Sequence, residues 1–324
     1  MKHVFSLLVA MFASASFAQS VPSGTPAMWR QPAPVQQLDM FWGSGGEAQR
    51  PVGPFKFIEE DTHGTNPKLK VVDSRGVKWG VKFDDEVHSE VAATRFFWAA
   101  GYRTDHAYFV PAGVITGASN LQRTAGFVDS RGRFKDARFE TDHKEAGVTA
   151  TKNFKKWKWN SHPFVGTKEF SGLLLMNVLT SNFDTKTDNN KVQSVTYSNG
   201  QVYNWYMIGD LGGTFGKAGG GGHSKWDLGD YRVEPFIGGV SGGRLRLLHR
   251  GKDSEYFQSI PVEHARWLYK LLAGLSRSQI EDAFRAAYSD RKVNQLSSSS
   301  DERTVRGFAD VVEQRLRTLG NAVR

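Results

Sequence analysis

Two short polar motifs, about twenty residues apart, carry the residue types that phosphoryl chemistry needs. The first is Asp184-Thr185-Lys186-Thr187-Asp188-Asn189, and the second is Asp210-Leu211-Gly212. Phosphoryl transfer from ATP needs one carboxylate to orient the attacking hydroxyl, and an amide and a second carboxylate to hold Mg²⁺ on the phosphates. Either motif alone is common by chance, but together, in this order, they predict a site of phosphoryl transfer.

Each polar residue of the motifs has a distinct expected role. Asp184 would accept or orient the proton of the hydroxyl, and Lys186 would neutralise charge on the transferring phosphoryl group. Asn189 would offer a neutral oxygen to Mg²⁺ and Asp210 a carboxylate, which are ligands that suit a hard cation. Asn190 could replace Asn189, and the sequence leaves this choice open. A polar loop with Asx turns would explain the first motif, but not the hairpin that leads directly to the second.

Upstream residues could bind the nucleotide itself. Lys82 lies near the end of an otherwise apolar strand pattern, from where it could contact the α- and β-phosphates. Glu90, on the helix expected to follow, could pair with Lys82, and Glu86, one helical turn earlier, competes for that role. Gly64 and Thr65 lie in the loop between the first two predicted strands, where backbone N–H groups could cover the phosphates.

The predicted secondary structure begins with strands. They are expected at residues 55–59, 68–73 and 77–83, with weaker candidates at 108–115 and 126–128. A helix should run from residue 84 or 85 to about residue 100, where a glycine ends it. Residues 129–160 are polar and basic and carry no clear pattern.

Helices dominate the second half of the chain. Apolar residues at helical spacing predict a helix over residues 167–183, with Thr167 as its N-cap, and this helix would place Asp184 at its end. A hairpin around Ser198-Asn199-Gly200 would place Asp210 at the end of its second strand. Further helices are expected at 262–275, 278–288 and 301–319.

These elements predict an α+β fold of two lobes. Residues 55–125 would form a β-rich N-lobe, and residues 126–324 a mainly helical C-lobe. Residues 19–54 are rich in Pro, Gly, Ser and Gln, which predicts an irregular linker or an irregular wrap around the domain.

The first eighteen residues have the pattern of a signal peptide. A short basic start precedes a mostly apolar run over residues 5–12, and Ser16 and Ala18 fit the positions before a cleavage site. This predicts export to the periplasm or out of the cell. No later stretch approaches roughly 18 uncharged apolar residues, so no integral membrane segment is expected after cleavage.

Composition narrows the possible chemistry. The chain has no Cys, which excludes disulfides, a thiol nucleophile and a Cys-based zinc site. Cleavage would remove Lys2 and lower the formal net charge from +9 by one, to +8. A basic balance favours anionic partners. Lys155, Lys156 and Lys158, interleaved with aromatic residues, could contact an anionic surface, although such a run is more often a solvated strand or loop with its aromatic residues turned inward.

The two motifs resemble those of the protein-kinase-like superfamily. Residues 184–189 are similar to the catalytic loop D-L-K-P-x-N, and Asp210-Leu211-Gly212 is similar to D-F-G. Asn182-Phe183 stand where typical protein kinases have His-Arg, so the resemblance is to atypical branches, namely phosphatidylinositol 3- and 4-kinases, HipA-type kinases and kinases of the secretory pathway. The short spacing from Lys82 to Glu90 also resembles lipid-kinase and HipA-like proteins.

The resemblance covers about residues 55–215. It implies ATP and Mg²⁺ as cofactors and a hydroxyl of a protein or lipid as acceptor. Two other functions keep the fold but change the activity. One is a pseudokinase that acts as a binding or scaffold module, and the other is an enzyme that transfers AMP.

Overall fold

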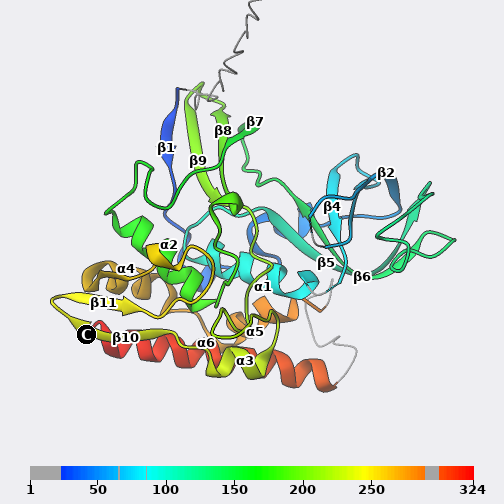
Figure 1. Ribbon diagram of the computed structural model, residues 1–324. Coiled ribbons are helices and arrows are strands. Elements are labelled where there is room, and N and C mark those ends of the chain that lie inside the picture. Colours follow the sequence, from blue (N-terminus) through cyan, green and yellow to red (C-terminus); the bar gives the residue numbers. More distant parts are fainter. Residues whose placement is uncertain (1–22, 65, 85, 289–298) are drawn as a thin grey trace, which may run out of the picture.

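The computed structural model describes residues 23–64, 66–84, 86–288 and 299–324. The predicted signal peptide and Thr65 therefore lie outside the described residues. The described chain forms a small lobe built on a β-barrel and a larger lobe of helices and short sheets (Figure 1). The predicted α+β class, with a β-rich N-terminal region and helices toward the C-terminus, is confirmed.

Five strands close the barrel of the small lobe. Their spatial order is β2 (Phe55–Asp61), β3 (Lys68–Val72), β4 (Lys78–Lys82), β6 (Arg133–Thr141) and β5 (His106–Thr116). Alternate residues on these strands face inward because side chains in a strand point to opposite faces. Residues 126–128 contribute only an isolated bridge between Val128 and Phe134, so the strand expected there is wrong.

The barrel extends further along the chain than the sequence indicated. β6 pairs with both β4 and β5, so the small lobe reaches Thr141, and the boundary predicted after residue 125 lies too early. The cause is the composition of β6. Charged residues interrupt its apolar alternation, and one of them, Arg138, is buried.

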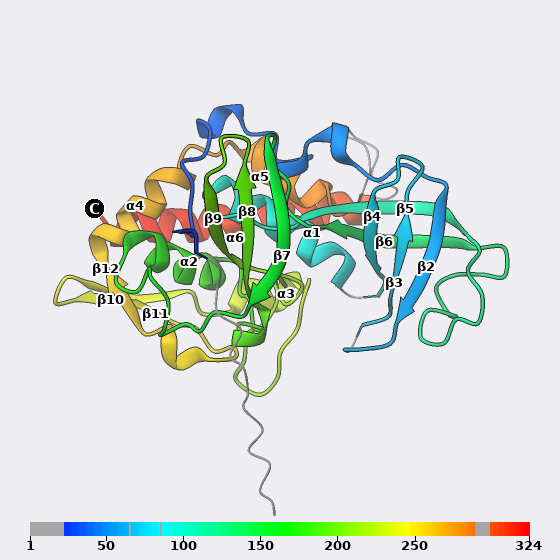
Figure 2. The ribbon, with the colours of Figure 1, turned by 90° about the horizontal axis from the view of Figure 1, so that it is seen from above.

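The helix α1 (Glu86–Ala99) follows β4 almost directly and lies between the two lobes (Figure 2). Its apolar residues, among them Val87, Val91 and Phe96, belong to the core of the larger lobe. The barrel has a separate core that includes Val81 and Phe139. α1 is therefore packed against the larger lobe, and it also contacts β5 and β6 of the barrel.

The buried helix α2 (Lys168–Leu179) delivers the first polar motif. Thr167 caps it as predicted, because its side chain accepts a hydrogen bond of 3.2 Å from the backbone N–H of Phe170. The helix ends four residues before the predicted end at residue 183. Ser181, with φ 51°, turns the chain away, and Arg315 of the C-terminal helix donates to the carbonyls of Val178 and Leu179.

A four-stranded sheet carries the second motif. Its order is β1 (Thr25–Ala27), β9 (Val202–Ile208), β8 (Asn190–Tyr197) and β7 (Val148–Lys155). β8 and β9 form the predicted hairpin, and Asp210 follows it closely. β1 belongs to the segment over residues 23–54, which otherwise contains the short 3₁₀ turns η1 (Val35–Gln37), η2 (Gly43–Gly45) and η3 (Glu47–Gln49). Met28, Met40 and Phe41 of this segment are buried, so it wraps the larger lobe and is not a free linker.

The remaining elements complete the larger lobe. They are α3 (Leu228–Val233), β10 (Ile237–Ser241), β11 (Arg244–Leu247), η5 (Ser254–Tyr256), β12 (Ser259–Pro261), α4 (Val262–Leu272), α5 (Arg277–Arg285) and α6 (Ser299–Ala322). The last three correspond to the predicted helices, whereas the short, partly Gly-rich sheet β10-β11-β12 had not been predicted. Across the described part of the chain, no helix combines the length and apolarity needed to cross a membrane.

Candidate active site

Lys82, at the end of β4, lies among three carboxylates. Its Nζ is 3.2 Å from Glu86, 3.6 Å from Glu90 and 3.7 Å from Asp210. One oxygen of each carboxylate lies within 4.8 Å of the others. The structure thus brings together Lys82, both of its candidate partners and the Asp of the second motif, from three different elements.

Local geometry explains why these side chains meet. Val81 and Phe83 point into the barrel core, so strand alternation turns Lys82 to the opposite face. Asp84 has a left-handed φ of 74°, and this turn leads the chain from β4 toward α1. Glu86 and Glu90 are one helical turn apart on α1 and therefore share one face of it.

The charges in this cluster stabilise one another. Burial alone would lower the pKa of Lys82, but Glu90, Asp210 and Glu86 raise it above its usual value, so the ammonium group keeps its proton. Burial alone would raise the pKa of Glu86, but Lys82 and Lys225 hold it at about 2. Burial raises the pKa of Asp210, and the nearby carboxylates add to this effect while Lys82 opposes it.

Two cations of this cluster were missed by sequence reasoning. Arg138, from β6, contacts the carboxylate of Glu90 and lies 2.6 Å from that of Glu140. Lys225 follows a Gly-rich loop of the larger lobe, and its Nζ lies 3.1 Å from Glu86. Neither residue belongs to a motif, and only the pairing of β6 with β4 and the path of the chain after Gly212 bring them here.

The glycine of the second motif is needed because Glu86 lies against it. A Cβ added at Gly212 would meet Glu86 Cδ at 2.8 Å and Oε2 at 2.9 Å. We expect Gly212→Ala to displace the carboxylate end of Glu86 and so to lower the free energy of unfolding by about 1 kcal/mol, the size of one weakened hydrogen bond. Urea unfolding would measure the change.

Gly239→Ala is a matched control for this substitution. Nothing lies within 4 Å of a Cβ at Gly239, and its backbone is outside the left-handed region. The control should therefore leave the stability almost unchanged. Equal stability of the Gly212 and Gly239 variants would contradict the close packing of Glu86 on the second motif.

The first motif forms a connected group at the end of α2. Lys186 Nζ lies 2.8 Å from Asp184 Oδ2. Asn189, in the 3₁₀ turn η4 (Thr187–Asn189), donates from its Nδ2 to the same Oδ2 at 3.1 Å and to the Asp184 carbonyl at 2.7 Å. The structure therefore brings Asp184, Lys186 and Asn189 together, with the Asp184 carboxylate held between two donors.

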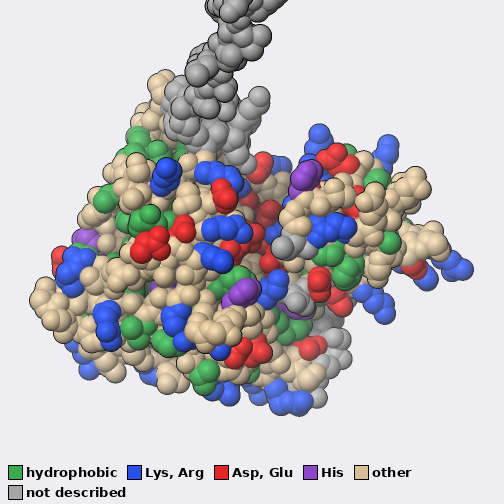
Figure 3. Space-filling model, viewed as in Figure 1, with side chains coloured by type: hydrophobic (Ala, Val, Ile, Leu, Met, Phe, Trp, Pro, Cys, Tyr) green, Lys and Arg blue, Asp and Glu red, His purple; other side chains and the backbone are tan. Residues whose placement is uncertain are grey.

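Backbone hydrogen bonds of flanking residues join the two segments that carry the motifs. Gly209 N–H donates to the Asn189 carbonyl at 2.7 Å, and Phe183 N–H donates to the Gly213 carbonyl at 2.9 Å. Asp184 and Asp210 lie between these two bonds on adjacent segments. Burial alone would lower the pKa of Lys186, but Asp184 and Asp210 raise it above its usual value. Lys186 therefore interacts electrostatically with both carboxylates. The two motifs thus form one site, and acidic side chains gather in the hollow between the lobes (Figure 3).

The choice between the two neighbouring asparagines has a structural answer. Asn190 is buried, and its Nδ2 donates to the Trp157 carbonyl at 3.1 Å. Asn189 is half-buried and lies against Asp184. Asn189 is therefore the amide on the side of the site, while its role as a metal ligand stays a prediction.

The β2–β3 loop reaches the carboxylate cluster from the small lobe. Asn66, at its end, hydrogen-bonds the side chain of Glu86. Gly64 has a left-handed φ of 77°, and Arg123 Nη1 donates to the carbonyls of Thr62 at 3.0 Å and of Gly64 at 2.8 Å. The loop is therefore anchored through its carbonyls, whereas Thr65 lies outside the described residues and its role is untested.

The basic-aromatic stretch is mostly structural. Trp157 and Trp159 are buried, and Trp159 Nε1 donates to the Thr185 carbonyl at 2.7 Å. Lys156 forms an exposed ion pair of 2.8 Å with Asp188, and Lys158 is exposed. The side chain of Lys155 is not among those that the structure describes, so an anionic surface contact through these lysines stays a prediction.

A second set of residues missed by sequence reasoning supports the first motif. The side chain of Thr185 lies 2.9 Å from His249 Nε2, and the backbone and side chain of Thr187 both donate to Asp253 Oδ2 at 2.9 Å. These partners come from a loop more than sixty residues away, which no local pattern connects to the motif.

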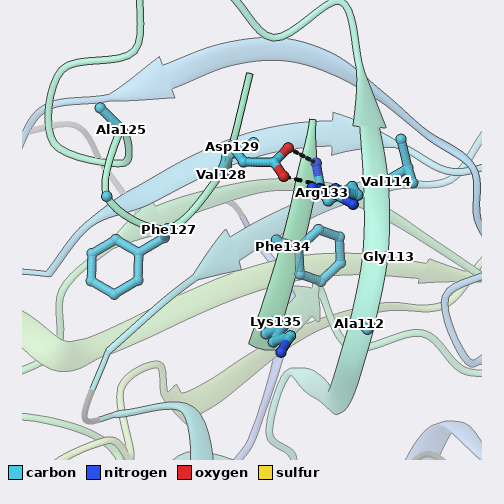
Figure 4. Close-up of a pocket in the computed structure, with 11 residues that line it drawn as sticks. Ala112, Gly113, Val114, Ala125, Phe127, Val128, Asp129, Arg133, Phe134 and Lys135 are labelled. Carbon is cyan, nitrogen blue, oxygen red and sulfur yellow. Dashed lines mark hydrogen bonds and ion pairs between the residues drawn. The ribbon is translucent and has the colours of Figure 1, made fainter. Parts of the chain in front are cut away.

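A separate cavity of about 890 Å³ opens beside the β5–β6 hairpin (Figure 4). Phe127, Val128, Asp129, Arg133, Phe134 and Lys135 lie along it, with an ion pair of 2.7 Å between Asp129 and Arg133. Its lining does not include any residue of the two motifs or of the Lys82 cluster. It therefore lies apart from the candidate active site.

The chain is similar to known proteins in structure but not in sequence. No protein-family model and no curated protein sequence matches the chain. The structure is similar to that of the Helicobacter pylori proinflammatory kinase CtkA, with 11% identity and a TM-score of 0.47 over 84% of this chain and 98% of that one. It is also similar to the Golgi casein kinase, with 10% identity and a TM-score of 0.41 over 84% of this chain and 72% of that one.

A third similar structure is the Golgi casein kinase with Mn and ADP bound. The identity is 11% and the TM-score 0.40, over 89% of this chain and 75% of that one. The three matched chains are kinases. Because these TM-scores mark a distant likeness, the proposed function rests on the geometry of the site.

Proposed function

We propose that this chain is an ATP-dependent phosphotransferase that moves the γ-phosphoryl group of ATP to a hydroxyl of a protein or lipid. One observation carries the proposal: backbone hydrogen bonds join the two chain segments that carry the motifs, so that Asp184 and Asp210 lie on adjacent segments. Asp210 in turn lies 3.7 Å from Lys82 of the other lobe. This is the set of groups that phosphoryl transfer requires.

The donor set fits a nucleotide with a divalent cation. Asp210 offers a carboxylate and Asn189 an amide oxygen, and hard cations such as Mg²⁺ prefer oxygen ligands. Lys82 keeps its positive charge and would contact the phosphates. Bound MgATP would supply the phosphoryl group, and the cation would neutralise charge on its oxygens.

The residues of the first motif would act on the acceptor. Lys186 and Asn189 both hold Asp184 Oδ2, which fixes the direction of the carboxylate. As the acceptor oxygen bonds to the γ-phosphorus, the bond from that phosphorus to ADP breaks and the hydroxyl proton passes to Asp184. Lys186 would stabilise the charge of the group in transfer.

Export is part of the proposal, on the strength of the signal-peptide pattern in residues 1–18. Since ATP is scarce outside cells, an exported enzyme would use nucleotide released nearby or inside a host. N-terminal sequencing of the protein recovered outside the producing cytoplasm should begin at Gln19. Recovery of the protein in the cytoplasm with residues 1–18 still attached would overturn the proposal that it is exported.

The reaction is tested with purified residues 19–324, Mg²⁺ and ATP labelled at either the α- or the γ-phosphate. We expect label to reach the protein or an added acceptor only from the γ-position, and Lys82→Met to prevent it. Transfer from the α-position would show an AMP transferase instead.

A lack of thermal stabilisation by millimolar MgATP would favour a binding module, since a ligand that binds the folded state stabilises it by mass action.

A further inference from the structure

Lys82 and Arg138 face each other directly across two paired strands. They are register partners in the antiparallel pairing of β4 with β6. Directly opposed residues lie close together on one face of a sheet, and like charges in such positions are unfavourable. The two cations can be neighbours here only because carboxylates neutralise both of them.

The carboxylates are divided between the two cations. Lys82 donates a hydrogen bond of 3.2 Å to Glu86, whereas its distance of 3.6 Å to Glu90 exceeds hydrogen-bonding range. Arg138 contacts Glu90 directly and also donates to Glu140 at 2.6 Å. Both contacts involve Nη1 of Arg138, so one guanidinium nitrogen lies between the Glu90 and Glu140 carboxylates.

The Arg138–Glu90 pair is more deeply buried than the Lys82–Glu86 pair. The side chains of Arg138 and Glu90 are 2% and 3% exposed. Those of Lys82 and Glu86 are 16% and 11% exposed, and Glu86 also meets Lys225 from the larger lobe. The Lys82–Glu86 pair therefore lies on the side of the cleft, and the Arg138–Glu90 pair lies behind it.

We propose that Glu86 is the carboxylate that positions Lys82 toward the nucleotide, and that Arg138 is a positioning residue that makes this arrangement possible by engaging Glu90. The inference rests on the proposed function, which gives Lys82 its task. Without Arg138, the unpaired charge of Glu90 would draw the Lys82 ammonium inward and away from the phosphates. The contrary arrangement makes Glu90 the partner of Lys82 and leaves Arg138 as a structural residue.

Nucleotide affinity separates the two arrangements. We expect Glu86→Gln to weaken MgATP binding by about tenfold or more, and Glu90→Gln to weaken it several-fold less. Arg138→Gln should also weaken binding by about tenfold, and adding Glu90→Gln to it should recover most of that loss, because the unpaired charge is then gone. Isothermal titration calorimetry with MgATP measures each dissociation constant.

Two further variants control this series. Arg133 lies on β6, as Arg138 does, but its side chain is 61% exposed and pairs with Asp129. Arg133→Gln should therefore not change the affinity for MgATP. Arg138→Lys keeps the positive charge beside Glu90 on a shorter side chain, so it should restore part of the affinity lost in Arg138→Gln. A larger loss in Glu90→Gln than in Glu86→Gln, or no recovery in the double variant, would overturn the proposal.

A measurement without nucleotide keeps the test independent of the proposed function. Double-mutant cycles in urea unfolding compare the coupling of Lys82→Met with Glu86→Gln and with Glu90→Gln. We expect a larger change in the folding constant for the Glu86 cycle. A larger coupling to Glu90 would overturn the pairing, whether or not ATP binds. If the wild-type chain binds no MgATP while the Glu86 coupling stands, the proposed function fails and the pairing survives.

Discussion

Asp210→Asn should reduce the affinity for MgATP by about a hundredfold and yet leave the nucleotide-free protein as stable as the wild type, or more stable. The loss of affinity is expected because a charged ligand is removed from the proposed cation site. The stability follows from the pKa of Asp210, which burial, Glu90 and Glu86 raise above its usual value. A carboxyl group with a raised pKa in the folded state destabilises the fold at neutral pH, because it must ionise there in an environment that disfavours its charge. Asparagine at position 210 has the same shape but no charge, so the substitution removes this destabilisation.

Calorimetric titration with MgATP and thermal unfolding without nucleotide measure the two effects. Asn189→Ala is the comparison, and it should lose less affinity, because water can replace a neutral ligand. A marked loss of stability in nucleotide-free Asp210→Asn would show that Asp210 serves the fold and not the cation.

Asp184→Ala should lower the turnover of phosphoryl transfer by about 10²–10⁴-fold while the dissociation constant for MgATP changes little. This is the usual contribution of a group that accepts or orients a proton in the transition state. Asp184 contacts Lys186 and Asn189, whereas Lys82 contacts Asp210, so nucleotide binding and proton transfer depend on different carboxylates. Initial rates with γ-labelled ATP and direct binding of MgATP separate the two quantities.

Asp188→Ala is the matched control in the same loop. Its side chain is 70% exposed and pairs with the exposed Lys156, so both turnover and affinity should stay near those of the wild type. Equal turnover of Asp184→Ala and the wild type would exclude the role assigned to Asp184, even if the chain transfers phosphate.

Local signals allowed the sequence to predict the elements that carry the motifs. Thr167 as an N-cap and the Asn199-Gly200 turn are short-range features, and they place α2 and the β8–β9 hairpin correctly. The same hairpin explains why Asp210 could be matched to Asp184 across some twenty-five residues. These parts of the site were predictable because each depends on neighbours in the chain.

The rest of the site depends on contacts that no local pattern reveals. Arg138 looks like one more charge in a polar stretch until β6 pairs with β4. Lys225 looks like a surface lysine after a glycine-rich loop until it meets Glu86. For the same reason the sequence left Glu86 and Glu90 as alternatives, since both lie on one face of a helix and only a cation from another strand distinguishes them.

The packing of α1 limits how the two lobes can move. The helix shares the core of the larger lobe, and Ser89 on it donates to the Gly212 carbonyl at 2.6 Å. Swinging α1 outward on its own would expose that apolar face to water, at a cost of about 25 cal/mol for each Å². α1 is also held to the barrel, because Arg95 on it donates to the Ala107 carbonyl of β5 at 2.6 Å and Glu90 contacts Arg138 of β6. A rotation of the barrel against the larger lobe would therefore have to break buried polar contacts of α1 on one side or the other, so both faces of this helix oppose opening of the cleft.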